Sequence, residues 1–200
     1  YLEKFIRSLR HLEVQVLRHL QGNSHLLGIR DCSVQRNYQK LIEESAFDLP
    51  QKIQDQLFKY SRKLIDEIDY VGAGTVEFIY DLGEEKIYFM EMNTRLQVEH
   101  PVSEMVTGVD LVDQQFSVAK GNSLEGLEVR PNGHAMELRI NAERVDLDSS
   151  GSLRFVPDPG RVTEAYFPAE ENIRVIQAVT NGSMVPPFYD SLVAQIIAWG

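Results

Sequence analysis

The chain has 200 residues, of which 43% are hydrophobic and 25% charged, close to the average for globular proteins. Its net charge of −10 argues against a nucleic-acid partner, because phosphate backbones are bound by clustered Lys and Arg. No run approaches the ~18 consecutive apolar residues of a membrane span, and no signal peptide is visible. The single cysteine, Cys32, cannot form an internal disulfide, so we expect a cytoplasmic protein with a buried thiol at this position.

The first half of the chain predicts two strands followed by a helix. Residues 11–17 alternate apolar and polar side chains, which is typical of a half-buried strand, and residues 24–30 return after a turn at 21–23. A helix is expected over 50–70, because apolar residues recur there at helical spacing. These residues are Ile53, Leu57, Tyr60, Leu64 and Ile68.

The second half predicts a hairpin, a helix and further strands. Gly72-Ala73-Gly74 ends the first helix, and strands are expected at 75–80 and 86–92. A second helix is expected over 102–119, closed by Gly121. Later strands are expected at 134–142, 160–165 and 191–199. The pattern indicates an α+β fold with two domains, 1–132 and 133–200, separated at Pro131-Asn132-Gly133.

Two carboxylates are expected to face each other in the hairpin. If it is centred on Glu84, Glu77 lies opposite Glu91, and Glu91, Asn93, Arg95 and Gln97 share one face while the strand continues. Like charges directly across a ladder repel, so such a pair needs a cation. Two carboxylates and an amide oxygen suit Mg²⁺ or Mn²⁺, and magnesium in proteins commonly accompanies phosphates. Solvent-facing acids on an ordinary hairpin are the alternative.

The segment after this hairpin, together with a basic segment at 30–40, indicates an anion site. Arg95 and Glu99 lie within five residues, so the Arg could hold bicarbonate while the Glu acts as general base. His100 precedes a proline and is better explained as a structural turn residue. Residues 30–40 are rich in hydrogen-bond donors, and Lys40 is the last residue of this segment. Its Arg and Lys side chains could hold a carboxylate or a phosphate. A surface loop is the alternative for that segment.

These motifs resemble the biotin carboxylases, which have the ATP-grasp fold. The resemblance is collinear over almost the whole chain and is most specific at 91–102. The motifs that carry it are Glu3-Lys4-Phe5-Ile6, Arg10-His11-Leu12-Glu13-Val14-Gln15-Val16, Arg30-Asp31-Cys32-Ser33-Val34-Gln35-Arg36, Gly72-Ala73-Gly74-Thr75-Val76-Glu77-Phe78, Glu91-Met92-Asn93-Thr94-Arg95-Leu96-Gln97-Val98-Glu99-His100-Pro101-Val102, Arg139-Ile140-Asn141-Ala142-Glu143 and Val185-Pro186-Pro187-Phe188-Tyr189-Asp190-Ser191.

The resemblance implies the C-terminal half of an ATP-grasp domain, followed by the beginning of the biotin carboxylase C-terminal domain. It implies ATP-dependent carboxylation of biotin with Mg²⁺ or Mn²⁺, in which bicarbonate attacks the γ-phosphate and the carboxyphosphate formed supplies CO₂. The catalytic residues would be Lys40, Arg95, Glu99 and Arg139. Metal ligands would be Glu77, Glu91 and Asn93, and the bicarbonate site would contain Lys40, Arg95, Gln97, Val98 and Glu99.

The resemblance also implies nucleotide and biotin contacts. ATP would be bound by Glu3, Lys4, Ile6, His11, Gln35, Tyr38, Glu77 and Glu91, and biotin by Arg139, Gln97 and Gln35. At Asn37-Tyr38 the family often has an Arg-His pair, and because Tyr has no cationic form, Tyr38 could offer only an ordinary hydrogen bond. The family's partners would be a biotin carrier domain, a carboxyltransferase subunit or domain and a second copy of the protein.

Three alternatives for the whole protein follow from the same residues. The chain opens at Tyr1 and ends inside a strand-like run, and no phosphate-binding glycine-rich lid is visible, so we expect a piece of an enzyme that is inactive alone. Another bicarbonate-activating ATP-grasp ligase, such as a carbamoyl-phosphate synthetase half, would share the metal and bicarbonate residues. A non-catalytic assembly domain is the third interpretation.

Overall fold

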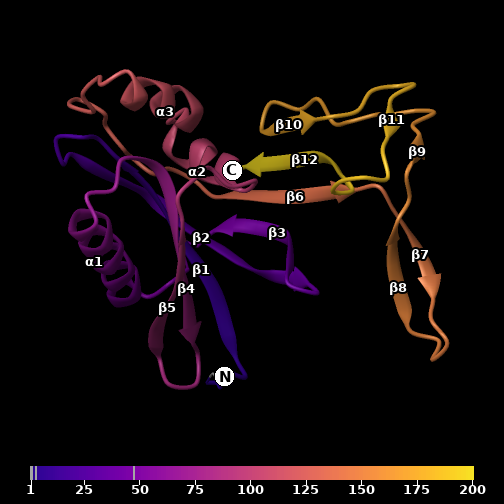
Figure 1. Cartoon of the computed structure of the whole chain (residues 1–200), viewed down its shortest axis with the longest axis horizontal. Coiled ribbons are helices and arrows are strands. Elements are labelled where there is room, and N and C mark those ends of the chain that lie inside the picture. The colour runs from indigo at the N-terminus through magenta and orange to yellow at the C-terminus, as the bar shows by residue number, and fades with distance from the viewer. Residues whose placement is uncertain (1, 3, 47) are drawn as a thin grey trace. The chain divides into compact units, whose positions relative to one another are not determined.

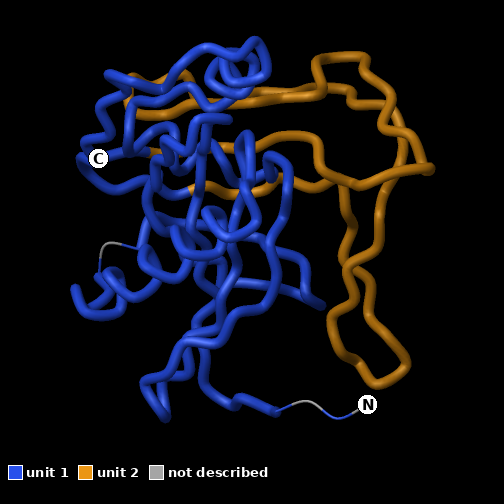
Figure 2. The backbone as a smooth tube through the Cα atoms, turned by 60° about the vertical axis from the view of Figure 1, so that its left-hand side comes forward, with its two compact units in different colours: residues 1–136, 199–200 blue, residues 137–198 orange. Residues whose placement is uncertain are grey.

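The computed structural model describes residue 2, residues 4–46 and residues 48–200. The α+β fold class is confirmed: three helices accompany a large antiparallel sheet in these residues (Figure 1). The chain divides into two compact units, residues 1–136 with 199–200 and residues 137–198 (Figure 2). Among the described residues, no helix combines the length and the apolar character needed to cross a membrane.

The first unit is built around five neighbouring strands in the order β3-β2-β1-β4-β5. Their bounds are β1 Leu9–Arg18, β2 Ser24–Arg36, β3 Gln39–Ser45, β4 Gly72–Asp81 and β5 Lys86–Asn93. The central strand β1 pairs antiparallel with β2 and β4, so it has neighbours on both edges. The β3 strand was not predicted. It forms a hairpin with β2 through a two-residue turn at Asn37 and Tyr38, both with positive φ.

One face of this sheet is apolar and packs against α1 (Gln51–Glu67). The predicted helix is confirmed, but its buried side differs from the prediction. Ser61 and Ile65 are buried after Leu57, whereas Tyr60 and Ile68 are 44% and 51% exposed. The buried stripe therefore follows every fourth residue, which is one of the ridges along which helices pack.

The predicted helix over 102–119 is in fact two helices, α2 (His100–Thr107) and α3 (Leu111–Ala119). Gly108 ends α2 in the left-handed conformation, with φ of 70°. Asp110 then caps α3 by accepting a hydrogen bond from the Asp113 backbone N–H. Leu111 and Val118 of α3 pack with Leu17 and Ala73 in a second apolar cluster.

The second unit consists of strands and loops. The chain enters it along β6 (Ala135–Asn141), which neighbours β12 (Leu192–Trp199), and β12 pairs with β10 (Ile173–Gln177). A separate hairpin joins β7 (Glu143–Leu147) and β8 (Leu153–Pro157), and β9 (Gly160–Arg161) pairs with β11 (Met184–Val185). The strands expected at 134–142 and 191–199 are confirmed, whereas the one expected over 160–165 covers only two residues.

Candidate active site

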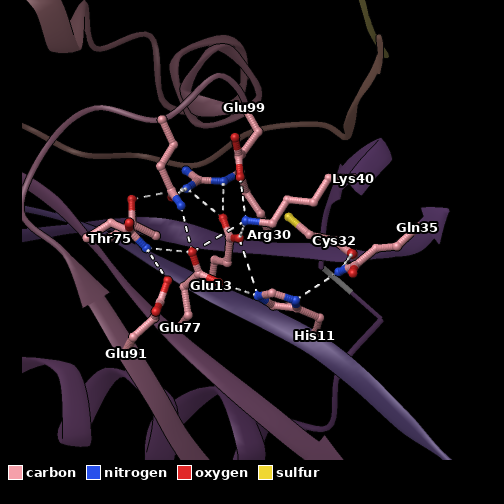
Figure 3. A network of polar contacts seen from close by, with 12 residues as sticks. His11, Glu13, Arg30, Cys32, Gln35, Lys40, Thr75, Glu77, Glu91 and Glu99 are labelled. Carbon is pink, nitrogen blue, oxygen red and sulfur yellow. Dashed lines mark hydrogen bonds and ion pairs between the residues drawn. The ribbon is translucent and has the colours of Figure 1, made fainter. Parts of the chain in front are cut away.

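The candidate site lies on the polar face of β1, which is buried. His11, Glu13 and Gln15 are 8%, 0% and 0% exposed, although the alternation predicts a half-buried strand. That prediction is wrong because hydrogen bonds tie this face to Lys40 on β3 and, through Arg30, to Ser103 on α2. Buried polar groups need partners, so this face forms a closely bonded network (Figure 3).

Lys40 lies among three carboxylates from three different segments. Its Nζ is 2.7 Å from Glu99 Oε1 and 3.4 Å from Glu77 Oε1, and it also donates to Glu13 (Figure 3). Burial would lower the pKa of Lys40, but the Glu13 and Glu99 carboxylates outweigh it and raise that pKa above its ordinary value. Lys40 is therefore a permanent cation beside the predicted general base.

The predicted carboxylate pair is confirmed, because Glu77 of β4 lies opposite Glu91 of β5. The side chain of Asn93 lies between them: its Nδ2 donates to Glu77 Oε1 at 2.7 Å and to Glu91 Oε1 at 3.1 Å. A hairpin centred on Glu84 gives this pairing at Glu77 and beyond it, but the register nearer the turn is shifted by one residue. Nearer the turn, Phe78 pairs with Phe89, and Met90 is an extra residue in β5.

Glu77 is 3% exposed and is held by donors on several sides. His11 Nε2 lies 2.5 Å from Glu77 Oε2, and Gln97 Nε2 donates to Oε1 at 2.6 Å. Burial alone would raise the pKa of Glu77. The hydrogen bond with His11, the charge of Lys40 and the bond from Gln97 outweigh burial and lower that pKa to about 2.

In the segment after β5, some side chains are exposed to solvent and others join the buried network. The strand ends at Asn93, so the shared face expected for Glu91 through Gln97 does not continue as a strand. Arg95 is exposed, and its Nη2 donates to Asn93 Oδ1 at 3.2 Å. Gln97 and Glu99 are buried, and Glu99 is the residue from which α2 begins. Val98 between them is half-buried.

The remaining predicted site residues lie in several places. Gln35 Nε2 is 2.9 Å from His11 Nδ1, so it belongs to the network. Lys4 donates to Glu84 at 2.7 Å and to Tyr88 at 2.6 Å beside the β4–β5 turn, and half-buried Ile6 follows it. Tyr38 is 99% exposed at the β2–β3 turn. Arg139 lies on β6 in the second unit, and Glu3 lies outside the described residues.

The donor set of Glu77, Glu91 and Asn93 suits a hard divalent cation. The Asn93 amide now bridges the two carboxylates through its Nδ2, at distances of 2.7 and 3.1 Å. Rotating that amide by half a turn would present Oδ1 to the same space, and three oxygen atoms would then converge. Oxygen ligands of this kind bind Mg²⁺ or Mn²⁺, so these residues fit such an ion.

Two known protein families match successive parts of the chain. The family model "Carbamoyl-phosphate synthase L chain, ATP binding domain" matches residues 1–127, and "Biotin carboxylase C-terminal domain" matches residues 137–200. Biotin carboxylase 1 of Bacillus subtilis is 47% identical over all of this chain. The chain belongs to the biotin carboxylase family.

Solved biotin carboxylase structures agree with this assignment. The biotin carboxylase–β,γ-ATP complex from Campylobacter jejuni has a TM-score of 0.90 and 44% identity, covering 99% of this chain and 43% of that one. The biotin carboxylase domain of Hydrogenobacter thermophilus 2-oxoglutarate carboxylase, in complex with MgADP, ADP and bicarbonate, has a TM-score of 0.89, 43% identity and the same coverage. An ATP-grasp-type domain followed by a biotin carboxylase C-terminal domain is thereby confirmed.

The match covers only part of these relatives. This chain aligns with 44% of the B. subtilis biotin carboxylase. It also aligns with 43% of the biotin carboxylase of Pseudomonas aeruginosa, at 47% identity. The chain thus spans less than half the length of these curated relatives.

Among the charged members of the buried network, Glu13 and Arg30 are not predicted as site residues from the sequence. Glu13 is fully buried and bonds both Lys40 and Arg30. A signal for Glu13 existed, since it shares the polar face of β1 with His11. The alternation does not tell whether a polar face meets water or protein, so that signal was ambiguous.

Proposed function

We propose that the protein containing this chain carboxylates biotin, using ATP and bicarbonate. The observation that carries the proposal is the position of Lys40, whose ammonium bonds Glu99 at 2.7 Å and lies 3.4 Å from Glu77, a member of the paired carboxylates. An anion that binds Lys40 would lie beside a general base and beside a site for a phosphate-bound metal ion.

In this proposal the residues divide into three groups by the chemistry they offer. Glu77, Glu91 and Asn93 hold Mg²⁺ or Mn²⁺, which when bound neutralises the phosphates of ATP. Lys40, Arg95, Gln97 and the backbone of Val98 hold bicarbonate, while Glu99 takes its proton. The bicarbonate oxygen then forms a bond to the γ-phosphorus as the bond to ADP breaks. Carboxyphosphate breaks down to CO₂ and phosphate, the phosphate or a base takes the proton of the biotin ureido nitrogen, and that nitrogen captures the CO₂.

Further contacts are proposed on the family resemblance. Lys4, Ile6, His11, Gln35 and Tyr38 contact ATP, as does Glu3 outside the described residues. Arg139 stabilises the negative charge that develops on the biotin oxygen, with Gln97 and Gln35 beside biotin. The proposal includes two domains, 1–132 and 133–200. It also includes a biotin carrier and a carboxyltransferase as partners, a homo-oligomeric assembly and a cytoplasmic location.

Bicarbonate-dependent ATP hydrolysis by the full-length protein tests the proposal. We expect hydrolysis to need bicarbonate and to rise with free biotin. Glu99→Gln should lower it by about 10²–10⁴-fold, because a general base is lost, while the circular dichroism spectrum is unchanged. Glu67→Gln, at an exposed position of α1 on the opposite sheet face, is the matched control and should keep wild-type activity. Full activity in Glu99→Gln would refute the proposed role of this residue.

A second candidate is a ligase that makes carbamoyl phosphate, since the family model matching residues 1–127 carries that name. Such an enzyme would also hydrolyse ATP with bicarbonate but would respond to an ammonia donor and not to biotin. Stimulation by biotin therefore favours the first proposal, and its absence together with stimulation by ammonium favours the second.

A further inference from the structure

A fully buried arginine lies directly behind the carboxylate network. Arg30 of β2 is 1% exposed, and its guanidinium donates to side chains from four segments. The acceptors come from β1, β4, α2 and the segment between β5 and α2: Glu13 Oε2 at 3.0 Å, Gln15 Oε1 at 2.8 Å, Ser103 Oγ at 2.8 Å, Thr75 Oγ1 at 3.3 Å and Gln97 Oε1 at 3.4 Å.

Two of these acceptors continue into the proposed bicarbonate site. The second carboxylate oxygen of Glu13 accepts from Lys40, so Glu13 lies between Arg30 and Lys40. The amide group of Gln97 accepts from Arg30 through Oε1 and donates to Glu77 through Nε2 at 2.6 Å. A single side chain, Glu13, therefore connects Arg30 to Lys40 (Figure 3). In the same way, Gln97 alone connects Arg30 to Glu77.

The geometry requires an arginine and not merely a positive charge. A guanidinium offers five N–H donors in a fixed plane, whereas an ammonium offers three donors around one point. Burial would lower the pKa of Arg30, but the carboxylates of Glu13 and Glu99 outweigh it and keep that pKa above its ordinary value. The group is charged, buried and bonded on several sides, which are the properties of a residue that fixes its neighbours.

We propose that Arg30 is a positioning residue for bicarbonate, which orients Lys40 through Glu13 and orients Gln97 directly. The inference rests on the proposed function, since it assigns Lys40 and Gln97 to bicarbonate. Arg30 itself touches neither substrate. Its loss moves two bicarbonate-binding groups and leaves the ATP contacts proposed at Lys4 and Ile6 unaltered, because the bonds of Arg30 described above run to other residues.

The test compares two substrates in two variants of the full-length protein. In Arg30→Lys and Arg30→Met, we expect the KM for bicarbonate to rise by about 10- to 100-fold, because small displacements of positioned groups have effects of this size. The KM for ATP should change by less than about threefold. General damage to the site would instead raise the KM for ATP and the KM for bicarbonate together. Arg30→Lys should retain more activity than Arg30→Met, because it keeps the charge beside Glu13.

Arg18→Met is the matched control. Arg18 is also a buried arginine of the β1–β2 hairpin, 6% exposed, and it bonds Asp66 at 3.3 Å, Asp69 at 3.2 Å and the Tyr70 carbonyl at 2.8 Å, all away from the network. It should lose thermal stability as the Arg30 variants do, yet keep both KM values. This control separates loss of stability from loss of positioning.

Three outcomes would count against the proposals in different ways. A folded Arg30→Lys protein with both KM values within about twofold of wild type would overturn the inference. If neither Arg30 variant folds while Arg18→Met does, Arg30 is required for folding and the positioning role is also overturned. If wild-type protein shows no bicarbonate-dependent hydrolysis of ATP, the proposed function itself is overturned.

Discussion

Glu77 shows how one residue can be held ionised inside the protein. Its carboxylate is buried, which opposes the charge, but His11, Lys40 and Gln97 lower its pKa from 4.5 to about 2. A lowered folded-state pKa gives stability that is present above the ordinary value and is lost as the pH falls toward 2. A shift of this size corresponds to about 3 kcal/mol.

We predict that Glu77→Gln flattens the acid dependence of stability. In urea unfolding of the full-length protein with chelator present, wild type should lose about 3 kcal/mol more than the variant between pH 4.5 and pH 2, because only wild type must protonate this group. Glu67→Gln, at an exposed position on α1, should follow wild type. Parallel curves for wild type and Glu77→Gln would contradict the prediction.

Cys32 is a second residue whose surroundings decide its chemistry. Burial raises the pKa of its thiol well above the ordinary value, and the nearby Glu13 carboxylate raises it further. We therefore expect no alkylation by iodoacetamide at about pH 8 in the native protein and complete alkylation in urea, measured on the Cys32 peptide by mass spectrometry. Equal rates in the two conditions would show that the thiol is accessible.

Residue pairs were easier to predict than residue environments. Glu77 and Glu91 were found because alternation and a single turn fix which residues lie opposite each other. Glu13 and Arg30 were not assigned to the site, because their acceptors and donors come from segments far apart in the sequence. The roles of Lys40, Arg95, Gln97 and Glu99 toward bicarbonate stay predictions.

At the scale of elements, the tight turn between β2 and β3 is the least expected feature. Asn37 and Tyr38 have φ values of 52° and 65°, a conformation that two-residue hairpins favour and that glycine usually supplies. No glycine marks this turn in the sequence, which explains why residues 31–45 were not predicted as a hairpin. The break between α2 and α3 was missed for a related reason, since one glycine, Gly108, does not distinguish the end of a helix from its interior.

The same turn gives a prediction about stability. Tyr38→Gly should raise the free energy of unfolding by about 0.5–1 kcal/mol, because glycine adopts positive φ without the strain that a side chain introduces. Asn37→Gly should have a smaller effect, since asparagine tolerates this conformation. Urea unfolding of both variants provides the measurement, and a destabilised Tyr38→Gly would mean that the exposed ring makes a contact worth more than the strain.

At the scale of the whole molecule, the chain leaves the first unit after Met136 and returns to it at Trp199. The return is tightly packed: the backbones of His134 and Gly200 bond each other, and Trp199 Nε1 donates to the Asn132 carbonyl at 3.0 Å. Gly133 has φ of 70°, and an added Cβ there would lie 2.7 Å from the Gly200 oxygen.

We predict that Gly133→Ala is strongly destabilising. It should lower the free energy of unfolding by more than about 2 kcal/mol, because backbone strain adds to a clash with another backbone atom. Gly151→Ala is the control, because its φ is 80° but nothing lies within 4 Å of an added Cβ, so it should cost about 1 kcal/mol. Thermal unfolding followed by fluorescence of Trp199 would distinguish them, and equal losses would contradict the close packing.

Family membership and fold class were predictable from the sequence, because the motifs that carry them are collinear along the chain. The limits of the two domains and the substrate contacts stay predictions. Arg139 is an example of such a contact. It lies in the second unit, and its role depends on how biotin binds, which the sequence pattern does not determine.

The extra residue in β5 has a consequence for how this sequence can change over time. Upstream of Met90, Phe89 pairs with the buried Phe78, and downstream Glu91 lies opposite Glu77, so the strand presents odd-numbered residues first to one face and then to the other. Deleting Met90 would make Phe89 and Glu91 consecutive, so the alternation of a regular strand would keep Phe89 toward α1 and Glu91 toward the site, still opposite Glu77. The strand can therefore lose its residue at position 90 and keep the carboxylate pair, whereas loss of a paired residue such as Phe89 would not spare the ladder.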